Sequence, residues 1–296
     1  MITVAATGLA WKATTPTMVG VTRFLRHRPA VIGLGLIVLL GLGTLFADRL
    51  APHDPVFIDL SHKFAPPLTK GHLLGADELG RDVLSRLLHA GRISLTVGLA
   101  AMAVTVVVGA ALGSLAGYCR GAVDAVLLRV TDAMLSFPPI FLLLALAAFV
   151  RPSLATITLI IGVTSWMDVT RMVRGQTLAL REQEFVTGAR GLGASAGRII
   201  LRHLLPNTVG IIAVAATLSV ARAILLESYI SFLGYGIQPP LASWGNMLNN
   251  AQSYFTLAPW VAIFPGLTIT VAVTSFNFLG DGLRDALDPR ALTSRS

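Results

Sequence analysis

The stretch ISLTVGLAAMAVTVVVGAALGSLAGYC, from Ile93 to Cys119, contains no charged residue. About 20 apolar residues are enough for a helix to cross the hydrocarbon core of a bilayer, so this stretch is long enough to span one. The whole chain is similarly apolar, with 54% hydrophobic and 13% charged residues over 296 positions. A soluble domain carries about a quarter charged residues. The sequence therefore predicts an all-α membrane protein.

Other apolar runs lie on both sides of this stretch. They are Ala30–Ala47, Ala133–Val150, Pro152–Met167, Leu204–Ala221 and Trp260–Gly280. We expect the run from Leu204 to continue to about Phe232, across Arg222 and Glu227. The first run follows three arginines and is too long for most cleaved signal peptides, so it indicates an uncleaved signal-anchor. Together these runs predict six transmembrane helices.

The distribution of Lys and Arg predicts the orientation, because cytoplasmic loops are enriched in these residues. With the N-terminus inside, fifteen lie on the cytoplasmic side, seven lie outside and Arg222 lies within a span, which accounts for all 23. An even number of spans then places both termini in the cytoplasm. We expect a multi-pass protein of the cell (inner) membrane.

These boundaries predict the following organisation. Residues 1–29 form a cytoplasmic tail, 30–48 the first transmembrane helix, 49–92 an extracytoplasmic segment, 93–284 a five-helix transmembrane domain with a cytoplasmic loop at 170–206, and 285–296 a second cytoplasmic tail.

The cytoplasmic loop has the pattern of two helices joined by a tight turn. Met172–Leu192 is helical in spacing and contains no proline, and Gly193 can end a helix in the left-handed conformation. Ser195 can cap a second short helix that runs to Leu204. Pro206 then ends that helix or starts the next span. A solvated loop between two spans is the alternative.

The stretch EFVTGARGLG, from Glu184 to Gly193, resembles the EAA loop of binding-protein-dependent ABC importer permeases when it is continued to Leu205-Pro206. In this register the Glu-Ala-Ala of the loop falls on Thr187, Gly188 and Ala189. Thr187 and Gly188 depart from the pattern, as does His203 at its Ile position. The resemblance implies that a short helix docks into a groove of an ATPase subunit. The implied coupling residues are Glu184, Thr187, Gly188, Ala189, Gly193, Ser195, Leu205 and Pro206.

Three longer motifs resemble the C-type permeases of dipeptide, oligopeptide and nickel importers. They are Leu74–Arg86, Glu227–Pro240 with Ser243–Gly245 shortly after, and Asn277–Pro289. The resemblance implies a type I ABC permease fold of the MetI-like kind, with residues 93–284 as its transmembrane domain. It also implies three kinds of partner: a homologous B-type permease, two ABC ATPases and an extracytoplasmic substrate-binding protein.

No Gly-Lys-Ser/Thr occurs in the chain, so a Walker A phosphate loop is absent from the sequence. We therefore expect no enzymatic activity and no bound cofactor, with ATP and Mg²⁺ held by partner subunits. The six histidines show no metal-ligand spacing, so no metal site is predicted. The net charge of +8 comes from basic residues that punctuate apolar runs, which argues against nucleic acid.

Ionisable residues within membrane spans are candidates for function. Arg222 and Glu227 either meet partners in a neighbouring helix or subunit, or contact the substrate. The candidate residues on the pore or binding-protein side are Arg222, Glu227, Ser231, Gly234, Gln238 and Trp244. We expect peptide import; import of nickel or another small chelate is the alternative. Two rivals from other classes are a proton-coupled secondary transporter and an intramembrane enzyme.

Overall fold

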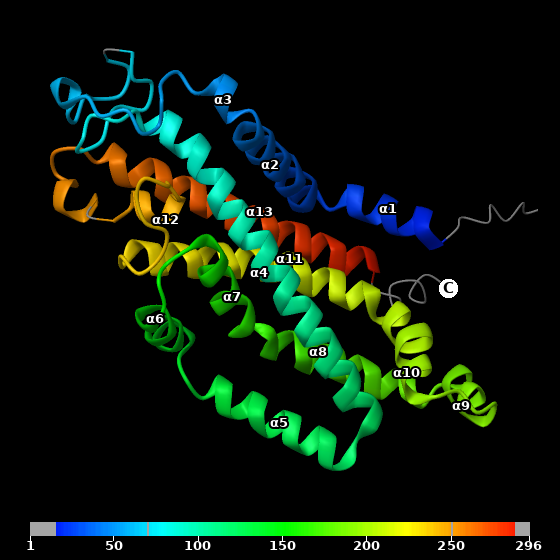
Figure 1. The fold of residues 1–296 in the computed structure, drawn as a ribbon. Helices are drawn as coiled ribbons and strands as arrows, with labels where there is room; N and C mark the ends of the chain where they lie inside the picture. Colours follow the sequence, from blue (N-terminus) through cyan, green and yellow to red (C-terminus); the bar gives the residue numbers. More distant parts are fainter. Residues whose placement is uncertain (1–15, 70, 250, 288–296) are drawn as a thin grey trace, which may run out of the picture.

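The computed structural model describes residues 16–69, 71–249 and 251–287, and it is built of helices (Figure 1). In chain order these are α1 Pro16–Arg26, α2 Arg28–Leu45, α3 Ala47–Leu50, η1 Leu60–His62, α4 Val83–Cys119, α5 Gly121–Leu135, α6 Pro139–Phe149, α7 Leu154–Val163, α8 Trp166–Arg181, α9 Glu184–Gly191, α10 Ala196–Ile199, η2 Ile200–Leu204, α11 Leu205–Phe232, α12 Trp244–Met247, η3 Ala251–Tyr254 and α13 Trp260–Leu287. Residues 1–15 and 288–296 of the two expected tails lie outside the described residues.

Four of the described helical stretches are long and apolar enough to cross a membrane. They are α2, α4, the run from α10 through α11, and α13. These four confirm the runs predicted at 30–47, 93–119, 204–232 and 260–280. The pair α5 and α6 would make a fifth span if the two helices count as one, although they are bent by 86°. The two remaining predicted spans are not single helices.

The predicted helix Ala133–Val150 is wrong, because the chain breaks between α5 and α6. Pro138 and Pro139 occupy the break and the first turn of α6. A proline ring fixes φ, lacks an N–H donor and disfavours helical conformation in the residue before it. A single helix cannot continue through this pair, and the two prolines were the sequence signal for the bend.

The predicted span Pro152–Met167 is also divided. α7 begins only after Ser153, whose side chain caps it, and it ends before Thr164 and Ser165. The Thr164 hydroxyl donates to the Ile160 carbonyl at 2.7 Å. The chain then turns into α8, so α7 alone has 10 residues and is too short to cross a bilayer by itself.

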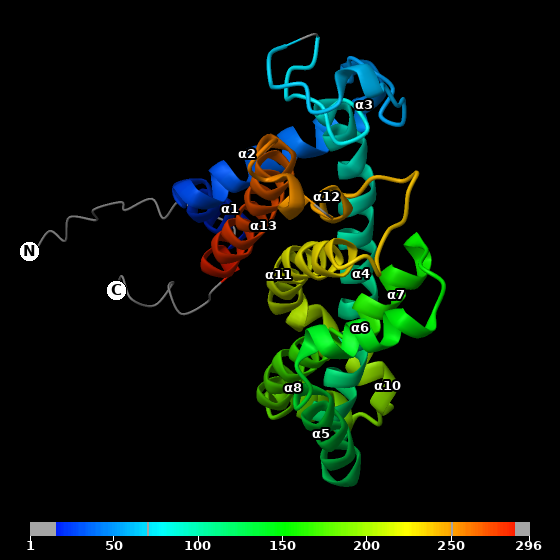
Figure 2. The ribbon, with the colours of Figure 1, turned by 90° about the vertical axis from the view of Figure 1, so that its left-hand side faces the viewer.

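α4 is the central helix of the fold (Figures 1 and 2). It has 37 residues and contacts α2, α5, α7, α8 and α11. The segment 51–82, together with α12, lies toward one end of α4, which we call the loop end. α9 and α10 lie toward the opposite end, which we call the α9 end. α4 therefore connects the two regions in which the sequence motifs occur.

Glycines on α4 bring α8 into close contact. A Cβ added at Gly113 would lie 2.6 Å from the Thr170 carbonyl oxygen, and Gly109 and Gly117 are equally crowded by α8. Such small residues at four-residue spacing let two membrane helices approach to backbone contact. This stripe holds α8 against the α9 end of α4.

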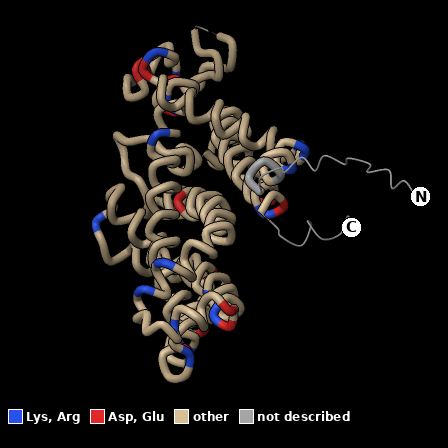
Figure 3. Tube along the Cα trace, turned by 90° about the vertical axis from the view of Figure 1, so that its right-hand side faces the viewer, with Lys and Arg blue, Asp and Glu red and all other residues tan. Residues whose placement is uncertain are grey.

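Charged side chains are unevenly distributed along the molecule. Figure 3 shows Lys, Arg, Asp and Glu mostly toward the ends and at the chain turns, while most of the helical body carries none. The body instead exposes many large apolar side chains. This arrangement suits a helical bundle whose middle is surrounded by lipid.

Candidate functional site

The end of α9 is a complete Schellman turn. Gly193 has a φ of +80°. Its N–H donates to the Arg190 carbonyl at 3.0 Å, and the N–H of Ala194 donates to the Ala189 carbonyl at 3.1 Å. These two bonds satisfy carbonyls that the helix leaves free. The predicted left-handed stop at Gly193 is confirmed.

The helix before this turn is shorter than predicted. The expected continuous helix Met172–Leu192 is wrong, because Gln183 is extended, with a ψ of 151°, between α8 and α9. The break lets Val186 bury completely against Ile199 and Leu204. Burial of such a side chain contributes about 1.5–3 kcal/mol, which outweighs the local preference for an unbroken helix.

The second short helix is confirmed. Ser195 accepts a hydrogen bond from the Arg198 N–H at 3.4 Å and so caps α10. α10 continues through the π-helical turn η2 into α11 without leaving helical conformation. Pro206 lies in the first turn of α11. The two helices thus project from the α9 end as one hairpin.

The guanidinium groups of Arg181 and Arg190 lie 5.7 and 5.6 Å from the ring centroid of Tyr118, near the end of α4. Cations at such distances are attracted to the face of an aromatic ring. This contact and the buried Val186 cluster attach α9 to the end of the central helix.

The outer surface of α9 and the residue that follows it combines small and apolar positions with the exposed charges of Glu184 and Arg190. Leu192 is 92% exposed and Phe185 is 43% exposed. Thr187 and Gly188 are also exposed, and a Cβ added at Gly188 would meet no atom within 4 Å. Exposed apolar side chains beside an open backbone are typical of a surface that another protein contacts closely.

The structure does not bring all predicted coupling residues to this surface. Glu184, Thr187, Gly188 and Ala189 lie on α9, and Gly193 and Ser195 lie in the turn that follows. Leu205 and Pro206 instead begin α11. Leu205 packs against the buried cluster that includes Val169, Val173 and Ala215. Its role in the structure is therefore to seat α11 rather than to form the exposed surface.

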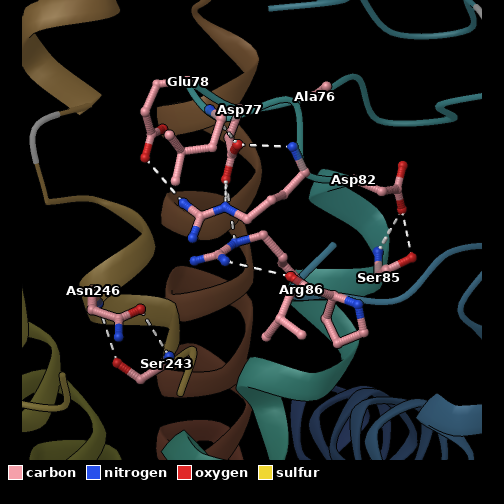
Figure 4. Close-up of polar contacts among 12 residues, drawn as sticks. Ala76, Asp77, Glu78, Asp82, Ser85, Arg86, Ser243 and Asn246 are labelled. Carbon is pink, nitrogen blue, oxygen red and sulfur yellow. Dashed lines mark hydrogen bonds and ion pairs between the residues drawn. The ribbon is translucent and has the colours of Figure 1, made fainter. Parts of the chain in front are cut away.

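At the loop end, the motif Leu74–Arg86 folds around the carboxylate of Asp77 (Figure 4). Its Oδ1 accepts from the N–H groups of Leu79 and Arg81 at 2.9 and 3.0 Å. Its Oδ2 accepts from Arg81 Nε at 2.7 Å and lies 3.4 Å from Arg86 Nε. The charges of this motif therefore organise the turn that precedes α4.

A second motif lies against the first. Ser243 and Asn246 form a capping box at the start of α12. The side-chain amide of Asn246 donates to the carbonyls of Ile237 and Leu241 at 3.1 and 2.8 Å. This arrangement orders the loop that follows α11.

Between the two motifs is a polar hollow of about 260 Å³. Residues of both motifs line it, namely Glu78, Arg81, Arg86, Ser231, Gly234, Ile237, Gln238 and Pro239, together with Asn246 and Asn249 just after the second motif. Three residues predicted for the pore or binding-protein side, Ser231, Gly234 and Gln238, are thus brought together here.

Glu227 lies in the interior and is 0% exposed. Its carboxylate accepts from the hydroxyl of Ser231 at 2.6 Å and from that of Ser94, on α4, at 3.2 Å. The N–H of Trp244 donates to Ser94 Oγ at 3.1 Å. Glu227 therefore has a partner in a neighbouring helix, Ser94 on α4, which was one of the two alternatives for this residue. Glu227 and Trp244 belong to a buried network and not to an open surface.

Arg222 is placed differently from Glu227. Its guanidinium forms an ion pair with Asp168 on α8. Both side chains line a hollow of about 240 Å³ between α8 and α11. Their side chains are 39% and 52% exposed, so the pair is accessible in a hollow that Thr105, Ser165 and Ser219 also line.

Residues 109–293 match the model of the binding-protein-dependent transport system inner membrane component. Residues 15–67 match the N-terminal transmembrane domain of oligopeptide transport permease C. The chain belongs to the family of binding-protein-dependent transport system inner membrane components.

Three relatives of this inner membrane component cover most of its length. The oligopeptide transport system permease protein OppC of Escherichia coli K12 is 44% identical over 271 residues, 90% of this chain and 89% of that protein. The glutathione transport system permease protein GsiD of Pectobacterium atrosepticum is 42% identical over 270 residues, again 90% and 89%. OppC of Bacillus subtilis is 37% identical over 268 residues, 90% and 88%.

Two features of this inner membrane component were not found from sequence. The hydrogen bonds that link Ser94 to Glu227 and Trp244 could not be predicted from local sequence, because the three residues come from distant segments. The ion pair of Arg222 with Asp168 was missed for the same reason. The glycine spacing on α4 was a visible signal for the α8 contact, since Gly109, Gly113 and Gly117 lie four residues apart.

Proposed function

We propose that this chain is one of two homologous permease subunits in an ATP-driven ABC importer of peptides. The observation that carries the proposal is the exposed short helix α9 with the exposed apolar side chains Phe185 and Leu192, held on the end of α4 in a chain that matches oligopeptide permeases over about nine-tenths of its length. The relatives named for oligopeptides and for glutathione, itself a small peptide, favour peptides over nickel chelates.

The proposed topology has six spans and cytoplasmic termini. α5 with α6, and α7 with the start of α8, supply the third and fourth crossings as bent spans. Broken helices are tolerated at membrane depth where protein or a water-filled cavity surrounds them, and a second permease subunit provides such surroundings. In this orientation the α9 end is cytoplasmic and the loop end is extracytoplasmic, in agreement with the distribution of Lys and Arg.

The proposed partners follow from this orientation. Two ABC ATPases bind ATP and Mg²⁺, and one of them receives α9 through Phe185, Leu192 and the exposed glycines. An extracytoplasmic binding protein delivers substrate at the loop end, beside the polar hollow. A homologous permease completes the pore, and this chain itself binds no nucleotide.

We further propose that Arg222 and Asp168 lie beside the translocation path. A peptide carries a positive terminus and a negative terminus, and the two side chains present the complementary charges. Exposed to water in a pore, such a pair costs little to separate. The side-chain selectivity of the importer would then reside largely in the binding protein, and the permease would respond to the charged termini.

The test is uptake of radiolabelled trialanine by a strain in which this gene has been deleted and then restored on a plasmid. We expect deletion to abolish uptake and the plasmid to restore it. Restored uptake should fail on ATP depletion and survive brief treatment with a protonophore. Uptake by the purified chain alone in proteoliposomes, driven by a proton gradient, would contradict the proposal and indicate a secondary transporter.

A further inference from the structure

Two histidines and an aspartate meet at the loop end, outside the polar hollow. They are His53, His72 and Asp82, and their candidate ligand atoms all lie within 4.8 Å of one another. His72 Nδ1 lies 2.9 Å and His53 Nδ1 3.9 Å from Asp82 Oδ1. The two imidazole rings lie 4.8 Å apart, centroid to centroid. The spacing of these three residues does not predict the cluster, because they meet only when the chain folds back between His53 and Asp82.

Ser85 holds the cluster in place at the start of α4. Asp82 Oδ2 accepts from the N–H of Ser85 at 2.8 Å and from its hydroxyl at 2.7 Å (Figure 4). The backbone N–H of His53 donates to the same hydroxyl oxygen at 3.1 Å. Asp82 Oδ2 is therefore occupied, and Oδ1 is directed toward the two imidazoles.

The cluster is buried on one side and open on the other. His72 and Asp82 are 5% and 1% exposed, whereas the side chain of His53 is 38% exposed. Two fixed ligands and one that can move form a site that an ion can enter from solvent. Bound Zn²⁺ places its nitrogen and oxygen ligands about 2.0–2.2 Å from the metal, so the exposed His53 ring needs to move inward by about an ångström.

We propose that His53, His72 and Asp82 form a binding site for a divalent transition-metal ion of the zinc class. Two neutral imidazoles and one carboxylate are the donor set of open zinc sites, in which water completes the coordination. A metal bound at His72 Nδ1 requires the neutral ring to carry its proton on Nε2, so the proton between Nδ1 and Asp82 Oδ1 moves through water to Nε2 and the imidazole stays neutral. The negative charge of Asp82 separates the metal from the N-terminus of α4, whose partial charge is positive.

The expected consequence is a clamp on the loop end. A metal bound to all three residues joins the chain just after α3, the turn at His72 and the start of α4. His62 lies beside the cluster, with its ring centroid 5.5 Å from that of His72. Its Nδ1 is instead paired with Asp59 Oδ2 at 2.7 Å, so His62 serves as a matched control outside the metal-binding set.

The experiment measures Zn²⁺ binding by the full-length chain, purified with its complex by a tag that contains no histidine. After metals are stripped with a chelator, competition with a chromophoric zinc chelator gives stoichiometry and affinity. We expect one Zn²⁺ per copy of this chain beyond any held by the other subunits. His53→Ala should weaken that site at least tenfold. His72→Asn, which keeps a donor near Asp82 but removes the imidazole, should weaken it as strongly.

His62→Ala should leave the affinity unchanged. Co²⁺ provides a second readout, because its visible absorption should appear in the wild-type complex and in His62→Ala but be lost in His53→Ala. The exposed His53 ring can be removed without opening the core, so loss of binding in that variant is not explained by unfolding. Equal affinities in wild type, His53→Ala and His72→Asn would overturn the proposal, as would the absence of Zn²⁺ bound by this chain. Neither measurement depends on peptide transport.

Discussion

The N–H of Trp244 donates to the hydroxyl oxygen of Ser94 at 3.1 Å, across 150 positions of sequence. The same hydroxyl donates to the carboxylate of Glu227 at 3.2 Å. Ser94 is thus both acceptor and donor, and it ties α12 to α4 and α11. All three residues are almost completely buried, where an unsatisfied polar group is costly.

Ser94→Ala should destabilise the fold, because it leaves the Trp244 N–H without its acceptor and removes a donor from buried Glu227. Loss of a partner from a buried polar group costs about 1–3 kcal/mol. Thermal denaturation of the detergent-purified chain, followed by size-exclusion chromatography, measures the effect. Ser136→Ala is the control, since Ser136 is exposed and its hydroxyl donates to the nearby Asp132 carbonyl. Equal midpoints for the two variants would contradict the role of Ser94.

Gly113→Val should separate α4 from α8, since even a Cβ at Gly113 would lie 2.6 Å from a backbone oxygen. Overpacking of this kind costs about 1–3 kcal/mol. The same denaturation assay should show a lower midpoint. Gly175→Val on α8 is the matched control, because nothing lies within 4 Å of a Cβ there. A midpoint for Gly113→Val at or above that of the control would show that the contact is not close.

Leu192→Asp should abolish trialanine uptake without lowering the amount of folded chain, because Leu192 is 92% exposed on the proposed ATPase-docking surface. We expect uptake to fall at least tenfold and the ATPase subunits no longer to co-purify. Leu68→Asp makes the same change at the loop end, where Leu68 is 82% exposed, and should leave ATPase binding intact. Co-purification of ATPases with Leu192→Asp at the wild-type level would contradict docking through this side chain.

Arg222→Asp and Asp168→Arg should each reduce uptake of trialanine about tenfold, because each places two like charges together in the hollow between α8 and α11. The double variant restores opposite charges in exchanged positions. If the pair is needed only as an ion pair, the double variant should recover uptake. If the orientation of the charges matters to the substrate termini, folding should recover but uptake should not. Normal uptake in both single variants would contradict the proposal that the pair lies beside the translocation path.

A hydrogen bond from the Ser61 hydroxyl, followed by the neighbouring His62, holds the pKa of the Asp59 carboxyl below its ordinary value of 3.8. Because the folded-state pKa is the lower one, the stabilisation is present above about pH 3.8 and is lost as pH falls through the folded-state pKa. Asp59→Asn should therefore lower the denaturation midpoint at pH 5 but not near pH 2. The Asp59 side chain is 32% exposed, so solvent screening should keep the difference small. A difference that persists at pH 2 would show that ionisation of Asp59 is not its source.

Much of the fold was predictable because lipid imposes a simple rule on the chain. The length and hydrophobicity of four apolar runs were enough to predict the helices α2, α4, α11 and α13. The predictions of a continuous third and fourth span were wrong, because hydrophobicity alone does not indicate where a helix bends. Pro138 and Pro139 held that information, whereas the break at Thr164 and Ser165 has no comparable local signal.

The candidate site was predictable where its residues are local. Gly193 ends α9 and Ser195 caps α10 by bonds to residues close in sequence, so spacing was sufficient. The break at Gln183 was not, because it depends on the burial of Val186 against Ile199. The network of Ser94, Glu227 and Trp244 likewise depends on helices that meet only in the folded chain.

The 37 residues of α4 form one uninterrupted helix. At about 1.5 Å per residue the helix is roughly 56 Å long, which exceeds the roughly 40–45 Å thickness of a bilayer with its headgroups. Its first turn carries Arg86 of the polar hollow, and its last turn carries Tyr118, on which Arg181 and Arg190 rest. An unbroken helix of this length joins the two ends of the molecule as one rigid element. A tilt that moves the Tyr118 end in one direction moves the Arg86 end in the other, without any change in the residues between them.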